Sequence, residues 1–288
     1  MKLQQKTIDK YEFLKNIIAD LESVAVAYSG GVDSAFLAKT ARDVLNERAF
    51  AVLGVSPTVA KSELDQAREL AISSDLQLIE VETNELADSD YAANPTNRCY
   101  FCKNELFGQI FLWAKSQGIH WVTDGANADD KGDWRPGSQA ALEHGVRSPL
   151  AEAGLTKDEI RAISKEMGLP TWDKPSIACL GSRFPYGSSI TPEKIRQLDK
   201  AEDLLRSLGF KQLRVRHHDE IARIEVEPQE IARMATEEVR LRIVEGFRKL
   251  GFKFVTLDLA GYVMGSLNYS IVTDILVNPD ARDAGQVG

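Results

Sequence analysis

The sequence lacks a long apolar run and lacks an excess of positive charge. No stretch approaches the roughly 18 consecutive apolar residues that a membrane span needs. The opening segment MKLQQKTIDKYEFLK has no apolar core and no small-residue cleavage site, so no secretory signal is visible and a cytoplasmic protein is predicted. The 35 Lys and Arg against 43 Asp and Glu give a formal net charge of −8. This balance argues against broad binding of nucleic acid, although a local basic patch stays possible.

Cysteine is scarce, with three residues among 288. An odd set of cysteines in a reducing compartment indicates reactivity or metal binding rather than a disulfide framework. The two-residue gap between Cys99 and Cys102 lets both thiolates reach one metal or cluster. Cys179 lies in a glycine-containing loop near Arg183, and a cationic neighbour favours the thiolate. A four-iron cluster with one open iron, a zinc site, a redox dithiol and buried inert cysteines are the four interpretations.

Residues 8–170 alternate short β-branched runs with helical segments, which predicts an α/β fold with a parallel sheet flanked by helices. A leading amphipathic helix is expected around 11–18, and the start of another is indicated by Thr156 with Glu159 three residues later. Strands are expected at 24–28, 49–56, 76–81 and 121–124, and helices at 34–45, 61–73, 103–117 and 156–167.

The second part of the chain reads as a smaller α+β domain. Helices are expected at 192–208 and 237–250, and strands at 212–217, 221–226 and 253–259. We therefore predict an α/β domain over 1–170, a connecting loop bearing Cys179 over 171–190, the α+β domain over 191–275, and a disordered tail over 276–288.

The strongest motif follows the apolar strand 24–28 and reads Ser29-Gly30-Gly31-Val32-Asp33-Ser34, with a helix behind it. Two glycines permit a tight turn and close approach of a ligand, and the helix start offers free N–H groups and a positive dipole end to a phosphate. Ser29 and Ser34 add hydroxyl donors, and Asp33 is suited to a magnesium ion on the phosphates. A plain strand-to-helix turn is the alternative, but the whole hexapeptide after a buried strand favours a phosphate site.

This hexapeptide resembles the signature of the ATP pyrophosphatase (PP-loop) superfamily, which includes GMP synthetases, NAD synthetases, argininosuccinate synthetases and tRNA thiolases. The resemblance implies that ATP is cleaved between the α and β phosphates and that a substrate oxygen is adenylated. No Gly-Lys-Ser/Thr ending is present, so the loop is not a Walker loop. Asp124 ends a predicted strand at the edge where ligands of α/β sheets gather, which places it near the nucleotide.

Longer strings resemble the LarE family over about residues 10–270. They are SRFPYG at 182–187, LRVRHHDEIARIE at 213–225, Asp124-Gly125, Arg135-Pro136-Gly137, and VTLDL at 255–259. LarE proteins insert sulfur into pyridinium-3,5-biscarboxylic acid mononucleotide, and the thiocarboxylate becomes part of the nickel-pincer nucleotide cofactor of lactate racemase and its relatives. The resemblance implies a PP-loop α/β domain with a small C-terminal domain, and a homo-hexamer.

The resemblance makes Cys179 the match to the sulfur-donating cysteine of the family. In single-cysteine members that residue attacks the acyl-adenylate, loses its sulfur and becomes dehydroalanine. Here Cys99 replaces a tryptophan of that form and Cys102 replaces a small residue. The chain is thus similar to a three-cysteine branch, for which a four-iron four-sulfur cluster on Cys99, Cys102 and Cys179 with a labile sulfide is implied. A persulfide route through Cys179 stays open.

Substrate contacts are predicted at Lys103, Ser182, Arg183 and Arg214. Arg214 and Arg216 alternate along a predicted strand, share a face and can bind a phosphate, although an exposed charged face is the alternative; resemblance favours Arg214. Ser182 and Arg183 match the loop lining the same pocket, and Lys103 can balance carboxylate or phosphate charge unless it is a solvated helix lysine. His217 and His218 face opposite ways and are interpreted as structural or surface residues. Glu202 and Glu225 match acidic positions that are weaker metal-binding candidates.

The predicted reaction uses ATP and Mg²⁺ to adenylate a substrate carboxylate, and sulfide on the open iron then displaces AMP. A tRNA thiolase would use the same loop and cysteines but needs a basic RNA-binding surface, which the net charge of −8 disfavours. A nucleotide sensor is disfavoured by the intact hexapeptide, and an ammonia-using synthetase by the cysteine trio. The sequence leaves open the type of metal centre, the sulfur source and the nickel enzyme served.

Overall fold

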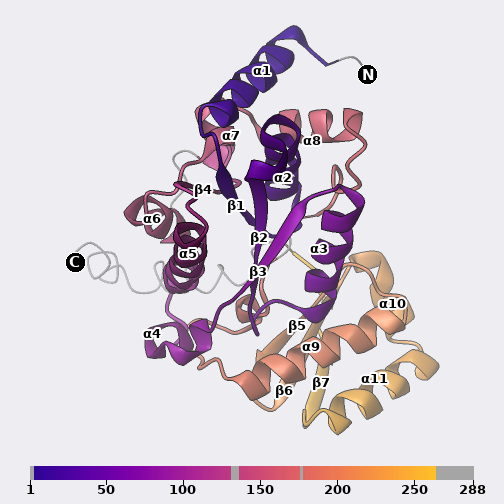
Figure 1. Cartoon of the computed structure of the whole chain (residues 1–288). Coiled ribbons are helices and arrows are strands. Elements are labelled where there is room, and N and C mark those ends of the chain that lie inside the picture. Colours follow the sequence, from indigo (N-terminus) through magenta and orange to yellow (C-terminus); the bar gives the residue numbers. More distant parts are fainter. Residues whose placement is uncertain (1–2, 131–135, 176–177, 264–288) are drawn as a thin grey trace, which may run out of the picture. The chain divides into compact units, whose positions relative to one another are not determined.

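The computed structural model describes residues 3–130, 136–175 and 178–263. These residues form two compact units, one within Met1–Leu180 and Ser189–Pro192, the other within Gly181–Ser188 and Glu193–Gly288 (Figure 1). Cys179 therefore belongs to the first unit, and Ser182, Arg183 and Arg214 belong to the second. The predicted tail 276–288 and Arg135 of the family string lie outside the described residues. Within the described part of the chain, no helix has the length and apolar character needed to cross a membrane.

The first unit is built on a parallel sheet with the strand order β3-β2-β1-β4, as the α/β class predicts. Its strands are β1 (Val24–Tyr28), β2 (Ala49–Val55), β3 (Gln77–Glu82) and β4 (Trp121–Thr123). Val24 pairs with Ala49 on one side and with Trp121 on the other. The chain therefore builds the sheet outward from β1 to β3 and then returns to the other side of β1. This reversal beside β1 is a switch point, and ligands of open α/β sheets bind at the carboxyl ends of the strands there.

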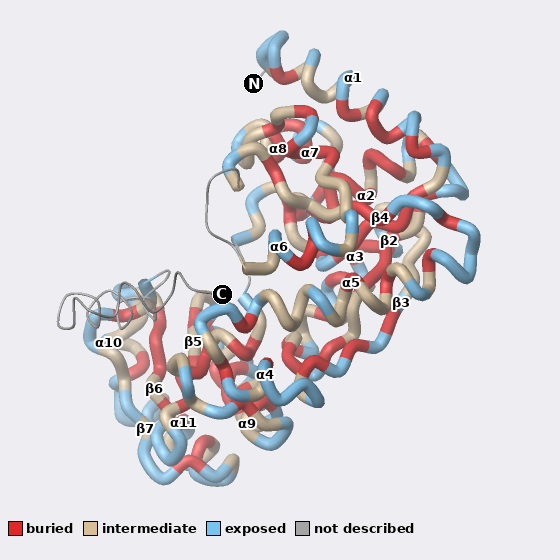
Figure 2. Tube along the Cα trace, turned by 90° about the vertical axis from the view of Figure 1, so that its left-hand side faces the viewer, coloured by how far each residue is buried: buried red, intermediate tan, exposed pale blue. Residues whose placement is uncertain are grey.

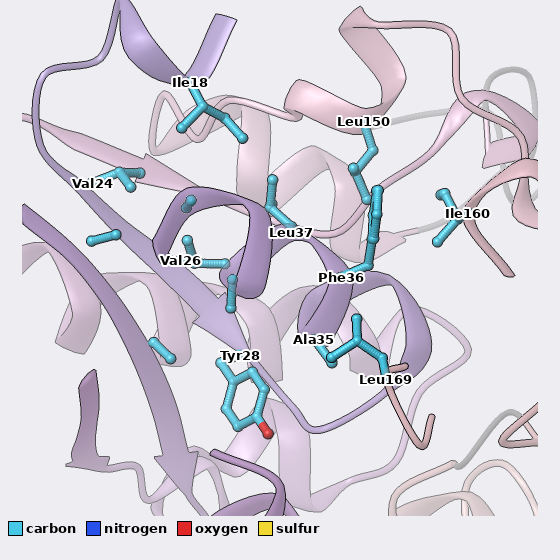
Figure 3. Close-up of a cluster of buried hydrophobic side chains, with 14 of the residues drawn as sticks. Ile18, Val24, Val26, Tyr28, Ala35, Phe36, Leu37, Leu150, Ile160 and Leu169 are labelled. Carbon is cyan, nitrogen blue, oxygen red and sulfur yellow. The ribbon is translucent and has the colours of Figure 1, made fainter. Parts of the chain in front are cut away.

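Helices cover both faces of this sheet. Val24, Val26 and Tyr28 of β1 join a core formed with α1 (Gln5–Ala19), α2 (Val32–Leu45), α3 (Lys61–Ser73), α7 (Pro149–Glu152) and α8 (Lys157–Glu166) (Figure 3). The intervening residues Ala25 and Ala27 join a second core formed with α5 (Arg98–Ser116) and α6 (Pro136–Glu143). Because successive strand residues face opposite sides, one apolar strand contributes to both cores. Most residues of β2 and α2 are buried, whereas most residues of β3 are half-buried or exposed (Figure 2).

The second unit is a small α+β module, as expected. Its sheet has the order β5-β6-β7, with β5 (Leu213–His218) antiparallel to β6 (Ile221–Val226), and β6 parallel to β7 (Phe254–Leu257). Its helices are α9 (Pro192–Ser207), α10 (Ile231–Met234) and α11 (Glu237–Lys249). Asp219, with φ of 53°, makes the tight turn between β5 and β6.

The expected helix at 103–117 begins earlier, at Arg98, so Cys99 and Cys102 lie on α5 rather than in a loop before it. Asn97 precedes the helix without a side-chain capping bond, and cysteine and aromatic residues are middling helix formers. The sequence therefore carries only a weak start signal there, the N-cap residue type of Asn97. The helices α4 (Ser89–Ala92), α6, α7 and α10 were also not predicted; three of them are single turns.

Candidate active site

Residues 29–31 form a compact turn between β1 and α2, and residues 32–34 are the first turn of α2. The backbone N–H of Ser29 donates to Oγ of Ser34 at 3.1 Å, and the two serine hydroxyls lie 3.0 Å apart. Gly31 is the N-cap of α2 and makes no side-chain capping bond. The first N–H groups of α2 thus have no acceptor from a cap, and an anion is the ligand that suits such a helix start.

Two glycines allow the backbone to pack closely around this turn. Gly30 has φ of +69°, and a Cβ there would lie 2.8 Å from Cβ of Ala67 on α3. Gly125 follows β4, and a Cβ there would lie 3.0 Å from the backbone nitrogen of Ser34. Side chains at these positions would force the loop away from its neighbours, so glycine holds the loop against α3 and brings the segment after β4 onto the start of α2.

Asp33 lies in the first turn of α2 and forms an ion pair with Lys157, the first residue of α8. Its other oxygen, Oδ1, is buried and has no hydrogen-bond partner among the described residues. An unused carboxylate oxygen beside a phosphate loop is a ligand that Mg²⁺ accepts together with phosphate oxygens and water. The residues present therefore fit the predicted magnesium ion.

Two lysines beside the loop were missed by the sequence analysis. Lys157 is placed by the capping box of α8, in which Thr156 accepts from the N–H of Glu159. Nζ of Lys174 lies 3.4 Å from the carbonyl oxygen of Gly30 and 3.3 Å from Oε2 of Glu63. The capping box fixes where α8 begins, but no sequence signal shows that its first lysine reaches Asp33. Together the two lysines place positive charge where a polyphosphate needs it.

A cavity of about 450 Å³ opens beside the loop and gathers most of the predicted site residues of the first unit. Its volume falls in the range of about 300–1,000 Å³ that small-molecule sites occupy. The predicted residues that line it are Ser29, Gly31, Asp33, Ser34, Cys99, Lys103 and Asp124. Gly30 and Val32 do not line it, because Gly30 packs against Ala67 and Val32 is buried in the core. Cys102 and Cys179 are also absent from its wall.

Asp124 and Lys103 both line this cavity and are both held by neighbouring residues. Oδ1 of Asp124 accepts from Oγ of Ser148 at 2.7 Å and from the N–H of Ala126 at 3.2 Å, which fixes the turn after β4. Nζ of Lys103 lies 5.4 Å from the ring centre of Phe107 on α5. A Cβ at Gly137 would lie 3.0 Å from Cγ of Lys103, so the start of α6 packs directly on this lysine. Lys103 is thus a held cation rather than a freely solvated one.

The three cysteines lie near enough to influence one another. Burial is the main cause that raises the pKa of Cys102, and the nearby charges of Cys179 and Glu85 raise it further. Cys99 has an exposed surface, yet the protein atoms around its thiol and the neighbouring Cys179 raise its pKa, against the opposing effect of Arg98 and Lys103. Thiols with raised pKa values stay protonated at neutral pH until a metal displaces the proton.

These soft donors fit an iron–sulfur cluster or another thiolate-binding metal centre. Among the described residues, however, no three His, Cys, Asp or Glu side chains are arranged to hold a single metal ion. A four-iron cluster does not require that arrangement, because each cysteine binds a different iron. Three thiolates are donors that a four-iron cluster and a zinc ion both accept, so the donor set is compatible with either.

The predicted substrate residues of the second unit differ in how they are paired. Arg183 is 3% exposed and binds Glu202 through two nitrogens at 2.8 and 3.1 Å. Arg216 binds Glu225 in the same way, at 2.9 and 2.7 Å. Both carboxylates are buried and held by arginines, so the structure uses these two metal-binding candidates as counter-ions.

Arg214 is the exception among these arginines. One nitrogen donates to the carbonyl oxygen of Leu213 at 2.7 Å, and the guanidinium lies 5.1 Å from the ring centre of Tyr262. Within the described residues, no carboxylate forms an ion pair with Arg214. Burial and the nearby charge of Arg183 lower its pKa. An incoming phosphate would balance this charge, so phosphate binding by Arg214 stays a prediction.

Ser182 and His217 occupy the same unit. Oγ of Ser182 accepts from Arg183 at 2.9 Å, and its carbonyl oxygen accepts from Arg216 at 3.0 Å, so both arginines hold this loop. His217 is 2% exposed and lies between the rings of Phe184 and Phe252. Its Nδ1 accepts from the N–H of Asp219 at 3.1 Å. This packing agrees with the structural role expected for His217.

No family model matches the chain. The chain is 47% identical over 263 residues to the uncharacterised protein slr1717 of Synechocystis sp., covering 90% of this chain and 97% of that protein. It is 37% identical over 252 residues to the pyridinium-3,5-bisthiocarboxylic acid mononucleotide synthase of Lactiplantibacillus plantarum, covering 87% of this chain and 91% of that enzyme. A more distant relative is a component of the glutamine-hydrolysing GMP synthase of Pyrococcus furiosus, 24% identical over 225 residues, which cover 71% of this chain and 69% of that protein.

The similarity to the Lactiplantibacillus enzyme extends over nearly the whole of both chains, and the phosphate loop, the switch-point cavity and the parallel sheet agree with the PP-loop architecture. The chain therefore belongs to the LarE family of pyridinium-3,5-bisthiocarboxylic acid mononucleotide synthases and is an ATP-dependent enzyme of the PP-loop superfamily.

Proposed function

We propose that the chain adenylates a carboxylate of pyridinium-3,5-biscarboxylic acid mononucleotide and converts it into a thiocarboxylate for the nickel-pincer nucleotide cofactor of lactate racemase or a related nickel enzyme. The observation that carries the proposal is the 37% identity to the Lactiplantibacillus synthase over 87% of the chain. The cavity supports it, because the phosphate loop, Cys99 and Lys103 line one space. Adenylation and sulfur transfer act on the same carboxyl group, first on its oxygen and then on its carbon, and therefore need such a shared space.

In the first half-reaction, a carboxylate oxygen of the substrate attacks the α phosphorus of ATP. The bond from the α phosphorus to the bridging oxygen breaks, and pyrophosphate leaves. The N–H groups at the start of α2 and the hydroxyls of Ser29 and Ser34 hold the leaving group, while Oδ1 of Asp33 binds Mg²⁺. Lys157 and Lys174 balance the negative charge, which makes the loop complementary to the charge that develops in the transition state.

In the second half-reaction, the sulfur of hydrosulfide attacks the acyl carbon. The bond between that carbon and the AMP oxygen breaks, AMP leaves, and the proton of hydrosulfide passes to water. Lys103 opposes the negative charge that develops on the acyl oxygen. Cys99, Cys102 and Cys179 would hold the four-iron four-sulfur cluster. When bound, this cluster would present a sulfide taken up from solution at the iron that no cysteine ligates.

The second unit recognises the substrate in this proposal. Arg214 binds the nucleotide phosphate, because its charge is not balanced by a carboxylate of the described residues, and Ser182 contributes a contact from the adjoining loop. Arg183 and Arg216 hold that loop through Ser182. From the resemblance to the family, we propose that six copies of the chain form a homo-hexamer. Light scattering of the purified protein measures the number of copies directly.

The test combines ATP–pyrophosphate exchange with product analysis of anaerobically purified, iron-reconstituted protein. We expect exchange that depends on the pyridinium dicarboxylate, and several thiocarboxylate products per chain when sulfide is added. Cys179→Ser should keep the exchange but lose product and iron. Arg214→Ala should raise the KM for the mononucleotide at least tenfold, whereas Arg240→Ala, at an exposed pair on α11, should leave it unchanged.

Three outcomes would contradict parts of this proposal. Exchange that requires tRNA instead of the mononucleotide would make the chain a tRNA thiolase. One product per chain, with conversion of Cys179 to dehydroalanine, would replace the cluster by sacrificial transfer. Product formation from a persulfide carrier in iron-free protein would assign sulfur delivery to a persulfide on Cys179.

A further inference from the structure

A buried polar cluster adjoins the cysteines and has no part in the chemistry described so far. It consists of Ser56, Thr58, Glu85 and Tyr91, all of them under 10% exposed. The hydroxyls of Ser56 and Thr58 lie 2.8 Å apart, and both donate to Oε1 of Glu85. The carboxylate is therefore held through one oxygen only. Its other oxygen, Oε2, is buried and has no hydrogen-bond partner among the described residues.

Tyr91 on α4 repeats this pattern. It is 0% exposed, and its Oη has no partner within the described part of the chain. A buried polar atom without a hydrogen bond is costly, and natural proteins keep few of them. Oη of Tyr91 is a donor and Oε2 of Glu85 is an acceptor. Two such atoms in one cluster indicate a binding site for a small ligand.

The cluster is tied to the cysteines by the course of the chain. The N–H of Leu180, the residue after Cys179, donates to the carbonyl oxygen of Thr58 at 2.8 Å. The side chain of Thr58 in turn binds Glu85. The electrostatic effects also place the cluster beside the cysteines. Burial raises the pKa of Tyr91 most, and the charges of Cys179 and Cys102 raise it further. The charge of Glu85 in turn raises the pKa of Cys102.

Arg98 adds positive charge at the same place. It precedes Cys99 at the start of α5, is 5% exposed, and donates to Oδ1 of Asn94. In the described residues, no carboxylate lies within ion-pair distance of Arg98. A buried cation without a counter-ion favours a bound anion.

Only a few ligands meet all three requirements. The hydroxyl of Tyr91 needs an acceptor, Oε2 of Glu85 needs a donor, and Arg98 needs a negative charge nearby. Hydrosulfide has lone pairs, one S–H proton and one negative charge. A fully deprotonated anion such as an adenylate phosphate would face the carboxylate without a proton to offer, and a water molecule would add no negative charge that could pair directly with Arg98.

We propose that Tyr91 and Glu85, beside Arg98, bind the hydrosulfide that arrives at the three cysteines and hold it before it is transferred. The inference rests on the proposed function and extends it, because it names the residues that receive the hydrosulfide. Tyr91 and Glu85 are positioning residues in this step, and neither forms a bond to the substrate carbon.

The test compares wild type with Tyr91→Phe, which removes one hydroxyl and keeps the buried ring. Equilibrium binding of radiolabelled sulfide to anaerobic, iron-reconstituted protein should weaken about tenfold in the variant, as expected for one lost hydrogen bond to a charged ligand. The rise in melting temperature on adding sulfide should shrink accordingly. Iron content and ATP–pyrophosphate exchange should match the wild type, and the sulfide-free variant should melt no lower, because the deleted hydroxyl has no partner to lose.

Tyr11→Phe is the matched control, because its hydroxyl lies 3.6 Å from Sδ of Met167, on the α1 and α8 side of the first unit. This variant should bind sulfide as the wild type does. Equal sulfide affinity in Tyr91→Phe and wild type would overturn the inference and leave adenylation intact. A wild-type protein that exchanges pyrophosphate but binds no sulfide would also overturn it, whereas a wild-type protein without exchange would refute the proposed function itself.

Discussion

Replacing Gly30 by alanine imposes two separate costs on the phosphate loop. The φ of +69° lies in the left-handed region, where a Cβ costs roughly 1–2 kcal/mol. The new Cβ would also lie 2.8 Å from Cβ and 3.0 Å from Cα of Ala67, and relieving such overpacking costs about 1–3 kcal/mol. We therefore expect Gly30→Ala to lower the free energy of unfolding by about 2–5 kcal/mol.

Two other glycines separate these contributions. Gly145 has φ of +71° and open space around its Cβ position, so Gly145→Ala should carry the backbone cost alone, roughly 1–2 kcal/mol. Gly31 has φ of −80°, and a Cβ there would lie 3.4 Å from Oγ of Ser29, so Gly31→Ala should cost little stability. The difference between Gly30→Ala and Gly145→Ala is then the cost of the contact with Ala67.

Urea denaturation measures the three stabilities, and pyrophosphate exchange measures the effect on ATP. Because α3 blocks the new methyl group, the loop must move relative to the start of α2, and we expect the apparent affinity for ATP to fall at least about tenfold in Gly30→Ala. Gly145→Ala should leave it unchanged. Equal stability of these two variants, with normal use of ATP in both, would show that Gly30 does not pack on α3 as described.

Three more predictions follow from single residues. Lys157→Gln should slow pyrophosphate exchange about 10- to 100-fold by removing a charge-assisted bond to the leaving group, and an unchanged rate would exclude Lys157 from that role. Glu202→Gln should lower the free energy of unfolding by about 3–5 kcal/mol because Arg183 loses its buried partner, whereas Glu245→Gln, at an exposed pair, should cost under about 1 kcal/mol in the same denaturation assay. Burial lowers the pKa of His217 to about 4, so the unfolded chain takes up its proton first and stability should fall as the pH drops from about 6.5 to 4. His217→Gln should flatten that part of the stability profile, and an unchanged slope would contradict the assignment.

The parts of the fold that were predictable depend on local pattern. The five apolar residues of β1 are bounded as expected, because a strand buried on both faces of a parallel sheet reads as one apolar run. The helix α3 and the strand β6 also have the predicted bounds. The capping box at Thr156 is confirmed as the start of α8, since both of its hydrogen bonds are made.

The parts that were not predictable depend on contacts between distant residues. Lys157 and Asp33 are 124 positions apart, and only the packing of α8 beside α2 brings them together. Glu85 and Tyr91 read as an ordinary acidic residue and an ordinary aromatic residue until their burial beside the cysteines is known. Partner identity is set by the tertiary fold, so sequence patterns cannot supply it.

The charge balance of the second unit distinguishes Arg214 from the neighbouring arginines. Arg183 and Arg216 are buried, but each has a buried carboxylate as its partner, so their desolvation is offset within the fold. Arg214 is partly buried on the same strand as Arg216 and has no carboxylate partner among the described residues, and its lowered pKa reflects that unfavourable position. A residue that is destabilised in the free protein gains most when an anion arrives. The paired arginines therefore build the loop at Ser182, and Arg214, which pairs with no carboxylate of the described residues, is the arginine that we propose for the phosphate.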